Sequence, residues 1–178
     1  MIRMEDFREE AVFQAAKAMG MAALTAPKAR GTDNLSIAIA GKDELHVLSE
    51  KLEELYRETR EEFLHRDAQN ILAAQAVLLI GSRVNVLGLD CGYCGFATCA
   101  EKQEKQAAAP CFFNANDLGI AIGSACSTAS EWKVDTRVMF SVGMAARSLG
   151  MLKDCPIVLA IAMSASGKNI FFDRTVNK

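Results

Sequence analysis

Apolar residues recur at two different spacings along the chain, and each spacing predicts one kind of element. Intervals of three and four residues are typical of a helix with one buried side, and they predict helices over residues 5–24, 43–65, 67–74, 114–133 and 137–149. Short apolar runs bounded by turn residues predict strands over residues 35–40, 76–81, 157–163 and 169–173. Strands separated by helices indicate an α+β or α/β arrangement in which helices cover a central sheet.

Two of these predicted helices have a distinctive side. Leucines line one side of residues 43–65 and charges fill the other, which is typical of a surface helix or of a helix facing a second subunit. In residues 114–133, Gly119, Gly123, Cys126 and Ser130 recur on one side. Such small residues allow a close approach, so we expect this side to pack tightly against another helix.

Composition narrows the classes of partner. The 178 residues are 51% hydrophobic, which favours a single domain with a large buried subunit interface, and hence a homodimer. No apolar run approaches the roughly 18 residues that predict a membrane span, and no basic stripe or aromatic–basic alternation predicts nucleic-acid binding. The net charge of −2 agrees with this. Neither a membrane nor a nucleic acid is an expected partner.

Four cysteines close together in mid-chain are the strongest chemical signal. Cys91, Cys94, Cys99 and Cys111 have the spacing C-x2-C-x4-C-x11-C. A compact loop that supplies three thiolates, with a fourth shortly downstream, is typical of a [4Fe–4S] cluster. Structural zinc is the second interpretation, although it usually takes two C-x2-C pairs. Disulfides are the third. The chain begins without a secretory signal, so we expect a reducing cytoplasm, where disulfides are rare.

Local sequence around these cysteines agrees with a metal site. Gly92 and Gly95 follow the first two cysteines, and glycine lets backbone N–H groups approach a ligand closely. Thr98 and Glu101 have the spacing of a capping box, which predicts a helix beginning at Cys99 whose positive end faces an anionic group.

The remaining cysteines and the histidines predict no metal ligand of their own. Cys126 and Cys155 lie in a predicted helix and at a predicted strand start, where cysteine usually behaves as a small core residue. Cys126 is nevertheless an alternative ligand if Cys111 is misassigned. His46 and His65 lie on the charged helix and are expected at the surface.

The cysteine loop resembles a known iron–sulfur module. Asp90-Cys-Gly-Tyr-Cys-Gly-Phe-Ala-Thr-Cys99 resembles the [4Fe–4S] module of corrinoid iron–sulfur proteins, whose fourth cysteine usually comes slightly later than Cys111. Nearly the whole chain is similar to a family of uncharacterised prokaryotic proteins described as containing a ferredoxin domain. The shared segments are Ala26-Pro-Lys-Ala-Arg-Gly31, the cysteine loop, and Pro110-Cys111 through Asp117-Leu-Gly-Ile-Ala-Ile-Gly-Ser124.

A second resemblance is to nitroreductase-fold flavoproteins, through residues 22–34, 117–133 and 154–167. It implies an α+β nitroreductase-like fold, a homodimer and FMN. The implied flavin contacts are Lys28, Arg30, Asn34 and Arg174, although solvated loop charges explain these residues equally well. The Arg-Arg-Ser-type segment that holds the flavin phosphate in those proteins is absent from the N-terminal part, and Lys28 stands where they usually have serine.

Together these patterns predict one domain, with a nitroreductase-like body (1–88 and 113–178) and an inserted cluster segment (89–112). The favoured function is electron transfer through one [4Fe–4S] cluster, with a redox partner protein that the sequence does not identify. A flavin-dependent reductase fed by the cluster is the first alternative, and a structural or oxygen-sensing cluster is the second. No catalytic residue is singled out, and whether the chain is an enzyme is left open.

Overall fold

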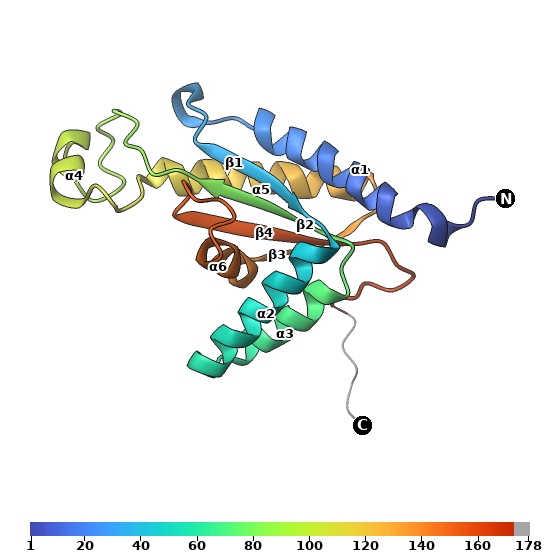
Figure 1. Cartoon of the computed structure of the whole chain (residues 1–178). Coiled ribbons are helices and arrows are strands. Elements are labelled where there is room, and N and C mark those ends of the chain that lie inside the picture. The colour runs from blue at the N-terminus through green and yellow to red at the C-terminus, as the bar shows by residue number, and fades with distance from the viewer. Residues whose placement is uncertain (173–178) are drawn as a thin grey trace.

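The fold is a four-stranded antiparallel sheet with helices on both faces (Figure 1). The structure is a computed structural model that describes residues 1–172. The strands are β1 (Leu35–Ala40), β2 (Ala76–Ser82), β3 (Asp135–Met139) and β4 (Ile157–Ser164). They lie in the order β1-β2-β4-β3, and every neighbouring pair is antiparallel. The expected α+β class is therefore confirmed.

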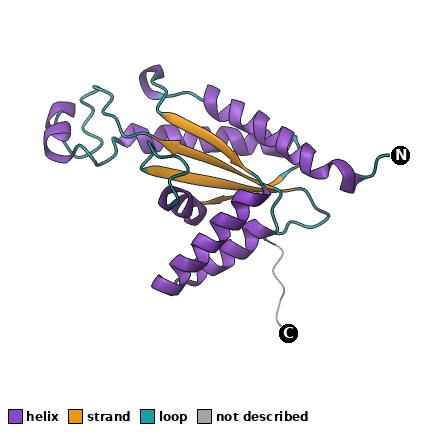
Figure 2. Ribbon diagram, in the orientation of Figure 1, coloured by secondary structure: helices purple, strands orange, loops and turns teal. Residues whose placement is uncertain are grey.

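The helices form a layer on each side of the sheet. Helices α1 (Met4–Thr25) and α5 (Phe112–Glu131) cover one face. Helices α2 (Lys42–Thr59), α3 (Glu62–Leu72) and α6 (Phe140–Ser148) cover the other. Helix α4 (Cys99–Gln106) stands apart from both layers, among long loops at one end of the sheet (Figure 2).

Strand β2 explains why the sheet needs both layers. Its side chains alternate, so Leu78 and Ile80 enter the core beneath α1 and α5, while Val77 and Leu79 enter the core against α2, α3 and α6. Every residue of β2 is buried, which is why it reads as an unbroken apolar run. Burial contributes about 1.5–3 kcal/mol for each such side chain.

Four of the expected elements are wrong in extent or type. The helix expected over 67–74 is α3, which spans Glu62–Leu72. The expected helix over 43–65 ends at Thr59, because Arg60 adopts a left-handed conformation (φ 63°) and its N–H caps the helix at the Tyr56 carbonyl. Of the expected helix over 137–149, the first residues belong to β3, which pairs with β4, and helix α6 begins only at Phe140. In the described part of the expected strand over 169–173, residues 170–172 form a turn and residue 169 has no regular structure.

Gly119 and Gly123 of α5 do not pack within the chain as expected. A Cβ atom placed on Gly119 or on Gly123 would meet no atom within 4 Å. The close approach occurs instead at Gly143 of α6, where a Cβ would lie 2.0 Å from the carbonyl oxygen of Val158 in β4. Hence α6 packs directly on the sheet, and one side of α5 is open.

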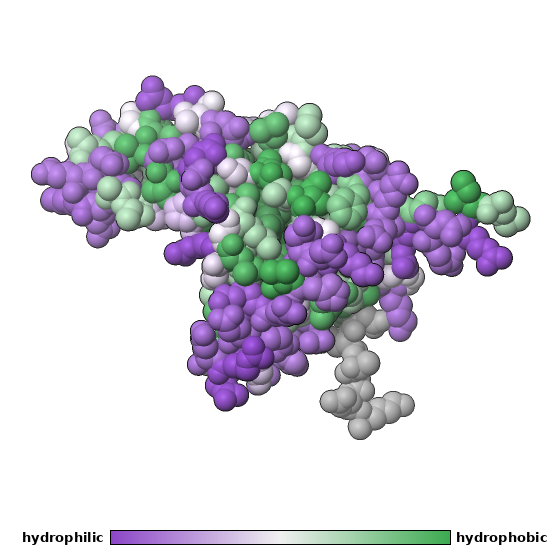
Figure 3. Space-filling model, viewed as in Figure 1, coloured by the Kyte–Doolittle hydropathy of each residue, from purple (hydrophilic) through white to green (hydrophobic). Residues whose placement is uncertain are grey.

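Apolar side chains also reach the surface beside the edge strand β1. Met21 and Leu24 of α1 are exposed and line an open groove with Ile37 and Ile39 of β1. In Figure 3, apolar residues gather over this side of the sheet, between the charged helices α2 and α3 and the charged end of the molecule around α4. No helix among residues 1–172 combines the length and apolar character needed to cross a bilayer.

Candidate metal centre

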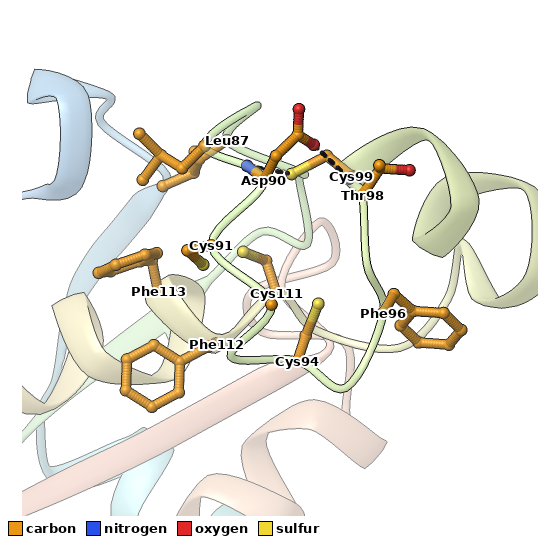
Figure 4. Close-up of a pocket in the computed structure, with 12 residues that line it drawn as sticks. Leu87, Asp90, Cys91, Cys94, Phe96, Thr98, Cys99, Cys111, Phe112 and Phe113 are labelled. Carbon is orange, nitrogen blue, oxygen red and sulfur yellow. Dashed lines mark hydrogen bonds between the residues drawn. The ribbon is translucent and has the colours of Figure 1, made fainter.

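The four clustered cysteines come from three segments and line one pocket (Figure 4). Cys91 and Cys94 lie in the loop that follows β2, Cys99 is the first residue of α4, and Cys111 directly precedes α5. Because α4 is short, the chain returns to the loop within a few residues of its end. The spacing C-x2-C-x4-C-x11-C thus places all four cysteines in the lining of one pocket.

Backbone turns fold the cysteine loop around this pocket. Gly92 and Gly95 have φ values of 74° and 86°, in the region that glycine occupies without strain. The Gly95 N–H donates a hydrogen bond to the Gly92 carbonyl at 2.9 Å, which closes a tight turn containing Cys94. Both positions therefore need the positive φ that glycine adopts readily.

Asp90 fastens the loop to the first turn of α4. Its carboxylate oxygen Oδ1 accepts a hydrogen bond from the Cys99 N–H at 2.6 Å, and its own N–H donates to the Cys99 sulfur at 3.4 Å. Asp90 itself has a positive φ of 46°, which a short polar side chain tolerates better than most. An N–H donor directed at sulfur is the kind of contact that stabilises a thiolate.

The predicted helix start at Cys99 is confirmed. Thr98 Oγ1 accepts from the Glu101 N–H at 3.1 Å, while Glu101 Oε2 accepts from the Ala97 N–H at 3.1 Å. A hydrogen bond from Lys105, followed by the bond from Ala97, lowers the pKa of Glu101. The positive end of α4 consequently lies at Cys99, beside the pocket.

Cys111 is held by a buried amide that the sequence did not single out. Asn114 Oδ1 accepts from the N–H groups of Cys111 and Asn85, at 3.0 and 3.3 Å. Asn85 Nδ2 in turn donates to Asn34 Oδ1 at 2.7 Å. Among the described residues, the buried Nδ2 atoms of Asn34 and Asn114 have no acceptor. The only signal of this network in the sequence is the position of Asn114, three residues after Cys111 at the start of a predicted helix.

An aromatic group lies beside the pocket. The Tyr93 ring meets the Phe112 ring edge-on at 5.2 Å between centroids, and Phe113 lies 5.3 Å from Phe112. Phe112 and Phe113 line the pocket with Phe96, whereas Tyr93 is 68% exposed. Aromatic rings therefore form part of the pocket lining beside the thiols.

The donor set fits a sulfur-ligated inorganic group. All four cysteines are free thiols, with Cys111 buried and Cys91 exposed. Among residues 1–172, no three His, Cys, Asp or Glu side chains converge tightly enough to hold a single metal ion. The four thiols surround a space and do not meet at one point.

The other two cysteines lie elsewhere. Neither Cys126 nor Cys155 lines the pocket. Burial raises the pKa of the Cys126 thiol, and a hydrogen bond with Thr136 opposes part of that rise. Cys155 is buried against Gly81, where an added Cβ would lie 2.6 Å from the cysteine Cβ. Both lie in or against the core, as the sequence predicts.

The described candidate flavin residues form hydrogen bonds within the chain through their side chains. The Lys28 ammonium donates to the carbonyls of Leu24 and Ala26 at the end of α1. Arg30 Nη1 donates to the Leu87 carbonyl at 2.8 Å, and Asn34 is buried in the amide network. Arg30 and Asn34 therefore both contact the segment that leads to the cysteine loop. Arg174 lies outside the described residues.

Comparison with solved structures confirms the nitroreductase-like fold. A nitroreductase with bound FMN from Bacteroides fragilis has a TM-score of 0.59 and 13% sequence identity, over 92% of this chain and 83% of that chain. A BluB-like flavoprotein from Clostridium difficile has a TM-score of 0.55 and 18% identity, over 93% and 89% of the two chains. At these identities the likeness concerns the fold alone.

Sequence comparison identifies the family. An uncharacterised protein of Archaeoglobus fulgidus is 38% identical over 181 residues, which cover 98% of this chain and 97% of that protein. Residues 107–174, which include Cys111, match the family described as "Uncharacterized protein containing a ferredoxin domain (DUF2148)". The chain belongs to this family of ferredoxin-domain proteins.

Proposed function

We propose that the chain binds one [4Fe–4S] cluster through Cys91, Cys94, Cys99 and Cys111 and transfers single electrons. The observation that carries this proposal is the shared pocket of these four thiols. A bound cluster of this kind supplies reversible one-electron chemistry. Residues 89–112 would then be a cluster-binding insertion on a body made of 1–88 and 113–178, in a protein of the reducing cytoplasm.

The residues around the thiols have separate roles in this proposal. The first turn of α4 offsets negative charge on the thiolates, and the Asp90 N–H stabilises the Cys99 sulfur. Phe112 and Phe113 restrict water. Exclusion of water and hydrogen bonds to sulfur are two of the means by which proteins set the reduction potential of a cluster.

Metal analysis of an oxygen-free preparation tests the proposal. We expect about four irons and about four inorganic sulfides per chain, with broad absorbance in the blue part of the visible spectrum. Stoichiometric zinc without sulfide would overturn the cluster assignment. Iron far below this level in protein reconstituted with iron and sulfide would do the same.

A flavin-dependent reductase is the second candidate, favoured by the FMN that the structural neighbours hold. In this case Arg30 and Asn34, which contact the segment before the cysteine loop, would place flavin close to the cluster. Acid release of FMN from the same preparation, read by fluorescence, separates the two candidates. About one FMN per chain supports the reductase, and no FMN supports electron transfer alone.

We also propose that the protein is a homodimer, whichever of the two functions holds. Apolar surface on the described residues supports this. Ile120 is 41% exposed on the open side of α5, between Gly119 and Gly123, and the groove beside β1 is apolar. Two glycines in a helix each cost about 1 kcal/mol relative to alanine. Their use on an open face is understandable if a second subunit packs there.

The variant Gly123→Glu tests this interface. Within one chain the new side chain meets no atom near its Cβ, so the fold should be kept. At a packed interface the same side chain would bury a charge without a partner, and we expect a monomer in place of a dimer. Light scattering after gel filtration gives the mass. A dimeric variant, or a monomeric wild-type protein, would exclude this interface.

A further inference from the structure

Lys102 of α4 is an unusual buried charge close to the cysteine site. Its relative exposure is 1%, which makes it the largest fully buried side chain of the described residues. The ammonium donates to the carbonyl of Ala107 at 3.5 Å and to the carbonyl of Ala109. No carboxylate of residues 1–172 forms an ion pair with it.

Two neutral carbonyls do not balance a buried positive charge. Transfer of an ammonium out of water is costly, and buried charges in proteins are generally paired or bound to a group of opposite sign. The neighbouring Lys105, by contrast, is exposed and pairs with Glu101 at 2.8 Å. The environment of Lys102 is therefore incomplete unless an anionic group lies nearby.

Lys102 does not itself line the thiol pocket, but it connects two chain segments that do, and the anionic group is expected there. Residues three apart share one side of a helix, so Lys102 lies on the side of α4 that carries Cys99. Its ammonium binds the Ala109 carbonyl, two residues before Cys111. Lys102 thereby links the segment that carries the third cysteine to the segment that carries the fourth.

We infer that Lys102 has two roles: it is a positioning residue that holds the segment before Cys111, and its ammonium is the buried positive charge that offsets the charge of the cluster. This inference rests on the proposed function. Four thiolates around the cluster carry net negative charge, and each electron accepted adds to it. The Lys102 ammonium stabilises the reduced state more than the oxidised state, because the attraction grows with the negative charge. Its bonds to Ala107 and Ala109 also hold the turn that presents Cys111.

The variant Lys102→Met, which keeps the length of the side chain but removes its charge, tests this inference. We expect the rate of iron loss to a chelator to rise about tenfold or more, by analogy with the effect of removing residues that hold metal ligands in place. The midpoint potential, measured by dithionite titration with EPR detection, should become more negative. Lys105→Met is the matched control, since it removes the same charge from the same helix at an exposed position. It should change both quantities less.

Each outcome decides the inference. A wild-type potential in Lys102→Met, or an equal shift in Lys105→Met, overturns the role as counter-charge. If Lys102→Met does not fold, Lys102→Gln gives the same comparison of potentials, because it keeps a hydrogen-bond donor without the charge. A wild-type protein that binds no iron would instead reject the proposed function itself.

Discussion

Replacing Cys91 and Cys94 together by serine should lower bound iron from about four atoms per chain to none. The two thiols supply half of the ligands in the pocket, and both come from the loop between β2 and α4. Serine oxygen is a poor replacement because iron–sulfur clusters are held by thiolates. Iron and sulfide analysis of oxygen-free protein, with the visible spectrum, measures the loss.

The matched control is Cys126→Ser. Cys126 does not line the pocket, and a serine hydroxyl can keep the hydrogen bond with Thr136. Full iron content is expected there. A third variant, Cys111→Ser, tests the fourth ligand alone and should also lose the intact cluster. Full iron in Cys111→Ser together with loss in Cys126→Ser would show that the fourth ligand was assigned to the wrong cysteine.

The cysteine site could be predicted from sequence because its determinants are local. Three cysteines lie within nine residues, and two glycines permit the turns between them. Thr98 and Glu101 specify the helix start by hydrogen bonds within four residues of each other. Such contacts need no knowledge of the rest of the fold.

Features that depend on distant partners were not predictable in the same way. Residues 135–139 form a strand because β4 offers them hydrogen bonds, although the apolar spacing that continues into α6 favoured a helix. The burial of Lys102 and Asn114 depends on how the segment after α4 folds back onto the helix and the loop. A lysine on a charged helix carries no sequence signal that it will be buried.

The flavin question also depends on distant contacts. Lys28 and Arg30 resemble flavin contacts in sequence position, yet both cations donate to carbonyls of the protein. The Lys28 ammonium complements the negative end of α1, and unlike Lys102 it also has a carboxylate within reach, that of Asp33 at 4.0 Å. Binding a flavin phosphate through either side chain would require these bonds to break. Likeness of fold alone therefore does not decide between the two functions.

The variant Gly143→Ala should destabilise the fold by about 3 kcal/mol or more, the upper range of overpacking in a core. Alanine in a helix is otherwise favoured over glycine by about 1 kcal/mol. At this position, however, the new Cβ would lie 2.0 Å from the Val158 carbonyl oxygen and 2.7 Å from its carbon. Both are backbone atoms of the central strand β4, so they cannot rotate away. We expect the melting temperature to fall by roughly 6–12 °C.

Gly20→Ala separates the clash from the general effect of the substitution. Gly20 also lies inside a helix, α1, but its Cβ would meet only Ile37 Cγ2 at 3.6 Å, an ordinary contact. This variant should be as stable as the wild type or more stable by up to about 1 kcal/mol. The direct packing of α6 on the sheet predicts that the free energy of unfolding falls in Gly143→Ala and does not fall in Gly20→Ala. Thermal and urea unfolding measure both changes. If both variants were stabilised, α6 could not lie against β4 as described, and the layer opposite α1 and α5 would have to be placed differently.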